Sequence, residues 1–172
     1  LRAYLLSRLM WDPYMENYDD EILGFCCAYY GEAGPYVKQY IDMTVENTGT
    51  RSLFKQNHMM IYSNMKDKGV LNLNLIERYQ MNALWEKAKN CNLTDEQMKR
   101  VLLSEISWRY WKASNKVCEF TRLQLGTKRL EQNKKLYEDM KKLGITRICE
   151  GGENALLTDD PRYFDPPREW TK

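Results

Sequence analysis

The sequence predicts an all-α protein: a bundle of about six helices followed by an irregular C-terminal strap. Apolar residues recur at helical spacing through most of the 172 residues, and proline or glycine stands where several of these runs end. Two polar pairs have the spacing of a capping box just before apolar runs. A chain of this length can bury roughly 70% of its unfolded surface. We therefore expect one helical domain over 1–172 with an apolar core.

The first two helices are marked by their ends. The first should end near Trp11, because Pro13 disfavours helical geometry in the residue before it. The second should begin near Asp19, with Asn17 as a candidate cap, and end at Gly31. The apolar positions expected to recur along these helices are Leu5, Leu6, Leu9 and Met10, and then Ile22, Phe25, Cys26 and Tyr29.

The third helix should begin at Gly34-Pro35, because proline is tolerated at the first helical position. Turn residues at Asn47 to Thr50 then introduce the least regular part of the chain, 46–71. A stretch of this length is either a functional loop or lid, or a connector whose methionines pack into the core. The buried stripe expected for the third helix is Val37, Tyr40, Ile41, Thr44 and Val45.

Two capping boxes predict the next pair of helices. Asn74 is followed three residues later by Glu77, and Thr94 is followed likewise by Gln97. The second of these helices should run to about Asn115. The face expected to be buried in the first of them is Leu73, Ile76, Leu84 and Ala88.

A last helix should restart after Gly126 and Thr127 and stop at Gly144. Its lysines and arginines interleave with acidic residues at helical spacing, which favours a solvated, salt-bridged face over a nucleic-acid-binding one. The tail, 145–172, is rich in proline and aromatic residues and is expected to cross the surface as an extended strap.

Composition excludes several classes of function. Hydrophobic residues make up 43% and charged residues 29% of the chain, which is typical of a soluble globular protein. The net charge of +2 gives no reason to expect a nucleic acid or an anionic membrane as partner. No apolar run approaches the roughly 20 residues of a membrane span.

Neither a metal site nor a cofactor is predicted. The five cysteines lack the spacing of a disulfide framework or a zinc site, and His58 is the only histidine. Phosphate-binding loops, dinucleotide fingerprints and nucleophile elbows are absent from the sequence. The cysteines are therefore expected to be mostly buried thiols.

Two pairs of residues are the candidates for contact with a substrate. Trp108 and Trp111 share a helix face at i, i+3, and their rings could stack on sugars or belong to a core or an interface. Glu150 and Glu153 flank the Gly151-Gly152 turn, where they could present carboxylates to a cleft or simply form the turn. We expect no catalytic residue within this chain.

A family resemblance rests on the first forty residues, which hold LRAYLL, LMWDP, Phe25, YYG, Pro35-Tyr36 and Tyr40. Residues 1–45 resemble a segment of large bacterial polysaccharide-degrading proteins that are similar to α-glucuronidases and β-N-acetylhexosaminidases, many of them filed only as a domain of unknown function. A weaker likeness covers Tyr137 to Gly152. In that family the segment lies at the end of a (β/α)-barrel and leads into a C-terminal helical region.

The resemblance implies a role for the whole chain. It would be the non-catalytic C-terminal helical domain of a glycoside hydrolase-like protein, packed on the barrel of the same polypeptide. Such a domain could edge the substrate cleft, contact an oligosaccharide or polysaccharide, or form a homodimer. Because the chain begins with Leu1 inside a helical pattern, we expect a longer polypeptide, periplasmic, cell-surface or secreted by resemblance. The alternatives are a helical carbohydrate-binding module and a protein-interaction module.

Overall fold

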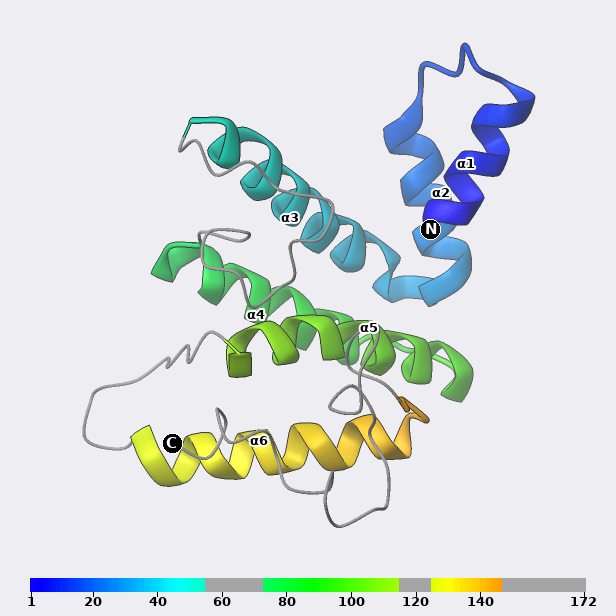
Figure 1. Ribbon diagram of the computed structural model, residues 1–172. Helices are drawn as coiled ribbons and strands as arrows, with labels where there is room; N and C mark the ends of the chain where they lie inside the picture. The colour runs from blue at the N-terminus through cyan, green and yellow to red at the C-terminus, as the bar shows by residue number, and fades with distance from the viewer. Residues whose placement is uncertain (55–72, 115–124, 147–172) are drawn as a thin grey trace. The chain divides into compact units, whose positions relative to one another are not determined.

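The computed structural model of the protein describes residues 1–54, 73–114 and 125–146 (Figure 1). The all-α class is confirmed, since the described residues form helices and none of them lies in a strand. The strap expected over 145–172 lies, from residue 147 on, outside the described residues. The helices are α1 (Arg2–Trp11), α2 (Tyr18–Tyr30), the 3-10 helix η1 (Gly31–Ala33), α3 (Gly34–Phe54), α4 (Leu75–Lys89), α5 (Asp95–Ser114) and α6 (Leu125–Lys142).

The described residues fall into two compact units. Those of the first lie within 1–102 and those of the second within 103–146, so the boundary falls inside α5, after Leu102. Each unit has buried apolar side chains of its own. The single helical domain expected over 1–172 stays a prediction.

The ends of α1 and α2 follow the local sequence signals. α1 ends at Trp11, two residues before Pro13, and α2 ends where Gly31 adopts a φ of 63°, a left-handed conformation that glycine tolerates. Asn17 occupies the position before α2, but its side chain accepts no capping hydrogen bond. The expectation of an Asn17 side-chain cap was therefore wrong. The first turn of α2 still contains three acidic residues, Asp19, Asp20 and Glu21, whose negative charge suits the N-terminal end of a helix.

Gly34 allows a close approach between α2 and the start of α3. A Cβ atom on Gly34 would lie 2.6 Å from the backbone nitrogen of Cys27 and 2.7 Å from the carbonyl carbon of Cys26. Backbone atoms cannot move aside as the end of a flexible side chain can. Glycine is therefore required where α2, η1 and α3 meet, and α3 then packs against both α2 and α4.

The third helix is longer than its sequence suggests. The turn expected at Asn47 to Thr50 was wrong, because α3 continues through these residues to Phe54. Asn47 is buried, and α3 packs against two other helices, so tertiary context overrides the weak local preference for a turn. Val45, expected in the buried stripe, is 64% exposed.

The core of the first unit is centred on α3 and α4. The rings of Tyr40 and Trp85 lie 4.9 Å apart between their centroids, and Trp85 is almost fully buried. Ile76, expected on the buried face of α4, is exposed, whereas the rest of that face is buried. The buried apolar residues of this unit are Met15, Cys26, Ala33, Val37, Tyr40, Leu73, Met81, Leu84, Trp85, Ala88 and Val101.

Both predicted capping boxes are confirmed. Asn74 Oδ1 accepts from the backbone N–H of Glu77 at 2.9 Å, and Glu77 Oε2 accepts from the backbone N–H of Asn74 at 2.8 Å. Thr94 and Gln97 exchange the same two bonds at 3.2 and 3.0 Å. These bonds satisfy N–H groups that a helix start leaves without intrahelical partners, and so they fix where α4 and α5 begin.

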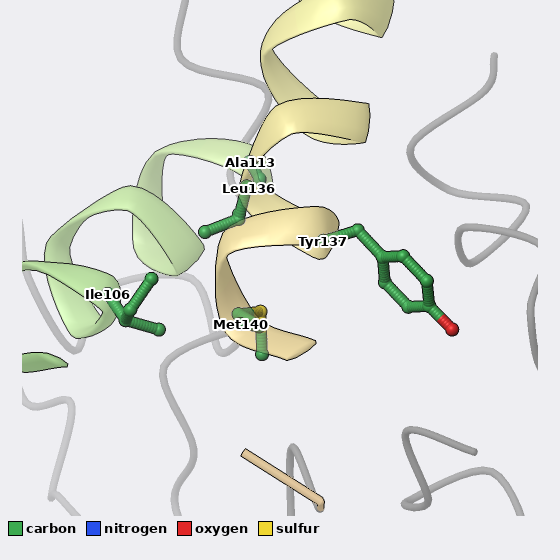
Figure 2. Close-up of a cluster of buried hydrophobic side chains, with 5 residues drawn as sticks. All are labelled: Ile106, Ala113, Leu136, Tyr137 and Met140. Carbon is green, nitrogen blue, oxygen red and sulfur yellow. The ribbon is translucent and has the colours of Figure 1, made fainter. Parts of the chain in front are cut away.

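The second unit is built from the end of α5 and from α6. Figure 2 shows its buried cluster, in which side chains of α5 meet side chains of α6. An ion pair between Arg109 Nη1 and Asp139 Oδ2, 2.8 Å long and largely shielded from solvent, joins the same two helices. α6 begins at Leu125, slightly earlier than expected, and the chain turns at Gly144, whose φ is 78°. The cluster contains Ile106, Ala113, Leu136, Tyr137 and Met140.

Candidate functional site

The two tryptophans proposed as sugar-stacking residues are buried. Trp108 is 1% and Trp111 is 3% exposed. Their rings stack on each other with centroids 5.1 Å apart and planes 9° apart, and Lys112 Nζ lies 5.5 Å from the centroid of the Trp108 ring. A sugar needs an exposed ring face for stacking. This arrangement is that of packed core residues.

The other two candidates, Glu150 and Glu153, lie outside the described residues. The same is true of His58 and of the irregular stretch around it. A role for Glu150 and Glu153 in contacting a substrate therefore stays a prediction.

The described chain brings a different set of residues together at the N-terminal end. We call this set the aromatic seam: Tyr4 of α1, Phe25, Tyr29 and Tyr30 of α2, and Arg100 of α5. Successive ring centroids lie 5.1 Å apart from Tyr4 to Phe25, 5.5 Å from Phe25 to Tyr29, and 4.9 Å from Tyr29 to Tyr30. Phe25 and Tyr29 share a face because they are four residues apart on a helix.

At one end of the aromatic seam, both carboxylate oxygens of Glu21 accept a hydrogen bond. Glu21 Oε2 accepts a 2.7 Å hydrogen bond from the Tyr4 hydroxyl, and Glu21 Oε1 accepts a 2.8 Å bond from Arg8 Nη2. The hydrogen bond from Tyr4, followed by that from Arg8, lowers the pKa of the Glu21 carboxyl. The same bond raises the pKa of Tyr4. Glu21 is therefore held in its charged form and is a poor candidate for a general acid.

Arg100 fixes the other end of the seam. Its guanidinium carbon lies 4.4 Å from the centroid of the Tyr29 ring, and Nη1 donates to the backbone oxygen of Tyr29 at 3.1 Å. Arg100 Nε also donates to Glu96 at 3.2 Å. Nearby, Glu32 accepts a 3.1 Å bond from the backbone N–H of Asn92. These contacts tie the start of α5 to the corner formed by α2 and η1.

The remaining polar groups of this region also have structural explanations. Lys38 Nζ lies 3.0 Å from Asp19 and 2.8 Å from Asp42, which links α2 to α3. Burial raises the pKa of the Cys26 thiol to about 11, so this thiol is unreactive near neutral pH. Across the described ranges, three or more metal-ligating side chains of the histidine, cysteine or acidic type are nowhere grouped to hold an ion.

One surface feature was missed at the level of sequence. No residue of α1 is fully buried, and Leu6, Met10 and Trp11 are 63%, 86% and 89% exposed. Tyr14, in the turn that follows, is 88% exposed. We call these four residues the α1 apolar surface. The signal was present, because Leu6 and Met10 lie about 100° around the helix from Leu5 and Leu9, so the four apolar residues form a stripe too wide for one packed face.

Residues 1–42 match a family model described as Domain of unknown function (DUF4838). The match covers α1, α2, η1 and the first turns of α3, and thus much of the aromatic seam. No curated protein and no solved structure matches the chain. Of the helices in the described ranges, none has the length and apolar character needed to cross a membrane.

Proposed function

We propose that the chain is a non-catalytic helical domain of a glycoside hydrolase-like, polysaccharide-degrading protein and that it buttresses the catalytic barrel of the same polypeptide. The observation that carries the proposal is the similarity of residues 1–42 to a family of unknown function, together with what those residues build. They form a packed corner whose carboxylate Glu21 is engaged by Tyr4 and Arg8. Because these polar groups bond to one another, we expect the corner to contribute stability and not catalysis.

The reaction of the whole protein would be hydrolysis of a glycosidic bond. That chemistry uses two carboxyl groups, roughly 5 to 9.5 Å apart, on either side of the bond. In this proposal both belong to the barrel. Resemblance to α-glucuronidases and β-N-acetylhexosaminidases suggests a uronic acid or N-acetylhexosamine substrate and a bacterial, periplasmic, cell-surface or secreted protein.

A helical protein-interaction module is the second candidate. It is favoured by the α1 apolar surface, because exposed apolar patches of several hundred Å² are characteristic of interaction sites. A carbohydrate-binding module is less well supported, since that hypothesis needs Trp108 and Trp111 exposed and both are buried.

Hydrolysis of a panel of aryl glycosides, including glucuronides and N-acetylhexosaminides, tests the proposal. Three proteins are compared: the full-length polypeptide, the same polypeptide lacking residues 1–172, and this chain alone. We expect turnover by the full-length protein, lost or short-lived activity after the deletion, and no turnover by the chain.

Two outcomes would overturn the proposal. Turnover by the chain alone would make it an enzyme and would direct attention to Glu150 and Glu153. A full-length protein that is inert across the whole panel would remove the glycoside hydrolase assignment and favour an interaction module.

A further inference from the structure

The polar side chains of α1 reach the rest of their unit through one carboxylate. The Tyr4 hydroxyl donates to Glu21 Oε2 at 2.7 Å, and Arg8 Nη2 donates to Glu21 Oε1 at 2.8 Å. The Ser7 hydroxyl donates instead to the backbone oxygen of Tyr4, within α1 itself. In the part of the chain that the structure describes, hydrogen bonds from α1 side chains to another helix therefore all end on Glu21.

The apolar packing of α1 on its unit is shallow. No residue of α1 is fully buried, and Leu5 and Leu9 are only partly buried. The Tyr4 ring covers Phe25 of α2, with ring centroids 5.1 Å apart. Most of the stability of a helix in a protein comes from burial of an apolar face. Because that contribution is small here, the two bonds to Glu21 should carry an unusually large share of the attachment of α1.

Both of these bonds depend on the charge of Glu21. An ionised carboxylate accepts with each oxygen and attracts a guanidinium, whereas a protonated carboxyl has no charge and presents a donor on one of its oxygens. Hydrogen bonds assisted by charge are roughly twice as strong as those between neutral groups. The Glu21 side chain is 18% exposed, so protons from solvent can reach it.

The charged groups around Glu21 leave Arg8 as its cationic partner. On the α1 side, the pKa of Arg8 is raised by its hydrogen bond to Glu21 and, less strongly, by the nearby charge of Asp12. The charged groups on the elements that pack near α2 have partners of their own: Lys38 of α3 with Asp19 and Asp42, Glu32 of η1 with the backbone N–H of Asn92, and Arg100 of α5 with Glu96.

We propose that α1 is an acid-released helix: the ionised carboxylate of Glu21 holds α1 on α2, and protonation of Glu21 frees α1 and uncovers the Phe25 ring. Met15, in the turn that follows α1, is buried. This anchor keeps the turn in place, so that the change is confined to α1 and leaves the core around Tyr40 and Trp85 intact.

The direction of the pH dependence follows from linkage. The bonds from Tyr4 and then from Arg8 lower the pKa of Glu21 when α1 is attached. The contribution of Glu21 to the attachment is therefore complete above the ordinary glutamate pKa, about 4.3. It is lost as the pH falls through the lower pKa of the attached state. We expect α1 to be attached at neutral pH and released in acid.

The inference goes beyond the proposed function and depends on neither a barrel nor a sugar. It is tested on this chain alone, by a structural measurement. An inert hydrolysis panel would leave the release of α1 unaffected, and an α1 that stays attached in acid would leave the buttressing role unaffected.

The first test is NMR of the chain between about pH 7 and about pH 3, a range that spans the ordinary pKa of a carboxyl. The signal is the nuclear Overhauser effect between the rings of Tyr4 and Phe25, and the internal reference is that between Tyr40 and Trp85, whose centroids lie 4.9 Å apart. We expect the Tyr4–Phe25 signal to fall several-fold in acid while the reference signal is kept.

The second test uses Glu21→Gln, which keeps the size of the side chain and one acceptor oxygen but is neutral at every pH. In this variant the Tyr4–Phe25 signal should already be weak at neutral pH and should no longer depend on pH. Arg8→Gln removes the cationic partner and should also weaken the signal at neutral pH. In each variant, the Tyr40–Trp85 signal verifies that the core has folded.

Asp19→Asn is the matched control. Asp19 belongs to the same first turn of α2 and pairs with Lys38 of α3, so this change removes a charge close to Glu21 without removing a bond to α1. The Tyr4–Phe25 signal of Asp19→Asn should follow that of the wild type at every pH.

Four results would overturn the proposal. The wild-type Tyr4–Phe25 signal could persist in acid, or it could disappear together with the Tyr40–Trp85 signal, which would mean unfolding of the whole unit. Glu21→Gln could keep a pH-dependent signal, which would assign the switch to another group. Asp19→Asn could behave like Glu21→Gln, which would attribute the effect to the general charge at the start of α2.

Discussion

At the scale of single residues, the ionisable groups of the N-terminal corner stabilise the fold and are not prepared for catalysis. Glu21 has a ready-made pair of donors in Tyr4 and Arg8, and Cys26 is buried with its thiol protonated. In an active site, such environments often prepare a group for catalysis. Here the Glu21 pKa is explained by the two donors that Glu21 holds in place, and the Cys26 pKa is explained by burial in the core.

The engagement of Glu21 predicts a change in its titration. Tyr4→Phe removes the hydrogen bond that contributes most to lowering the Glu21 pKa, so that pKa should rise toward its ordinary value. Because the folded-state pKa is depressed, the stabilisation that Glu21 contributes is present above its unfolded-state pKa and is lost as the pH falls through the folded one.

The measurement is an NMR titration of the Glu21 side-chain carboxyl carbon in the wild type and in Tyr4→Phe. Tyr79→Phe serves as the control, since it removes a hydroxyl from an exposed tyrosine on α4. An unchanged Glu21 midpoint in Tyr4→Phe would contradict the hydrogen-bond account.

Gly34 gives a second prediction at this scale. Gly34→Ala should destabilise the first unit by about 2 to 3 kcal/mol or more, because the new Cβ meets backbone atoms that cannot move aside. Gly24→Ala is the matched control. No atom lies within 4 Å of its added Cβ, so this helical position should gain about 0.5 to 1 kcal/mol. Urea unfolding measures both, and equal effects would show that the η1–α3 corner is looser than described.

At the scale of elements, the sequence predicts best where the cause is local. Pro13, Gly31 and the two capping boxes place helix ends within a residue or two, because each acts through bonds or dihedral angles of its immediate neighbours. The length of α3 was not predictable in this way. Its continuation past Asn47 accompanies packing against α2 and α4, which involves residues far away in the sequence.

The caps themselves give a graded prediction. Asn74→Ala should cost about 1 kcal/mol, because it removes the acceptor for the backbone N–H of Glu77. Asn17→Ala should cost much less. Asn17 holds the equivalent position before α2, yet its side chain makes no capping bond. Urea unfolding of the two variants checks the difference, and an equally large loss for Asn17→Ala would mean that α2 is capped in solution after all.

The same contrast between local and distant causes applies to the candidate site. Spacing at i, i+3 correctly places Trp108 and Trp111 on one helix face, where their rings stack. It does not determine whether that face is covered. The aromatic seam was equally hard to predict, because Arg100 is 71 residues away in sequence from Tyr29, its hydrogen-bond partner.

At the scale of the whole molecule, one set of internal contacts and one exposed surface support the proposed role. The aromatic seam joins α1, α2 and α5 within the first unit, and the α1 apolar surface offers contact to something outside that unit. A domain that buttresses another should have both: internal rigidity and an uncovered face. Substitutions that loosen the seam should therefore affect the durability of the full-length protein more than its chemistry.

The most direct test of this central claim is thermal inactivation of glycoside hydrolysis in the full-length polypeptide carrying Gly34→Ala, with Gly24→Ala as control. If the domain buttresses the barrel without contributing chemistry, Gly34→Ala should lower the temperature of inactivation while kcat/KM at low temperature stays at the wild-type value. A domain unfolded by Gly34→Ala in a polypeptide that inactivates at the wild-type temperature would contradict buttressing. A fall in kcat/KM while the domain remains folded would contradict a non-catalytic role.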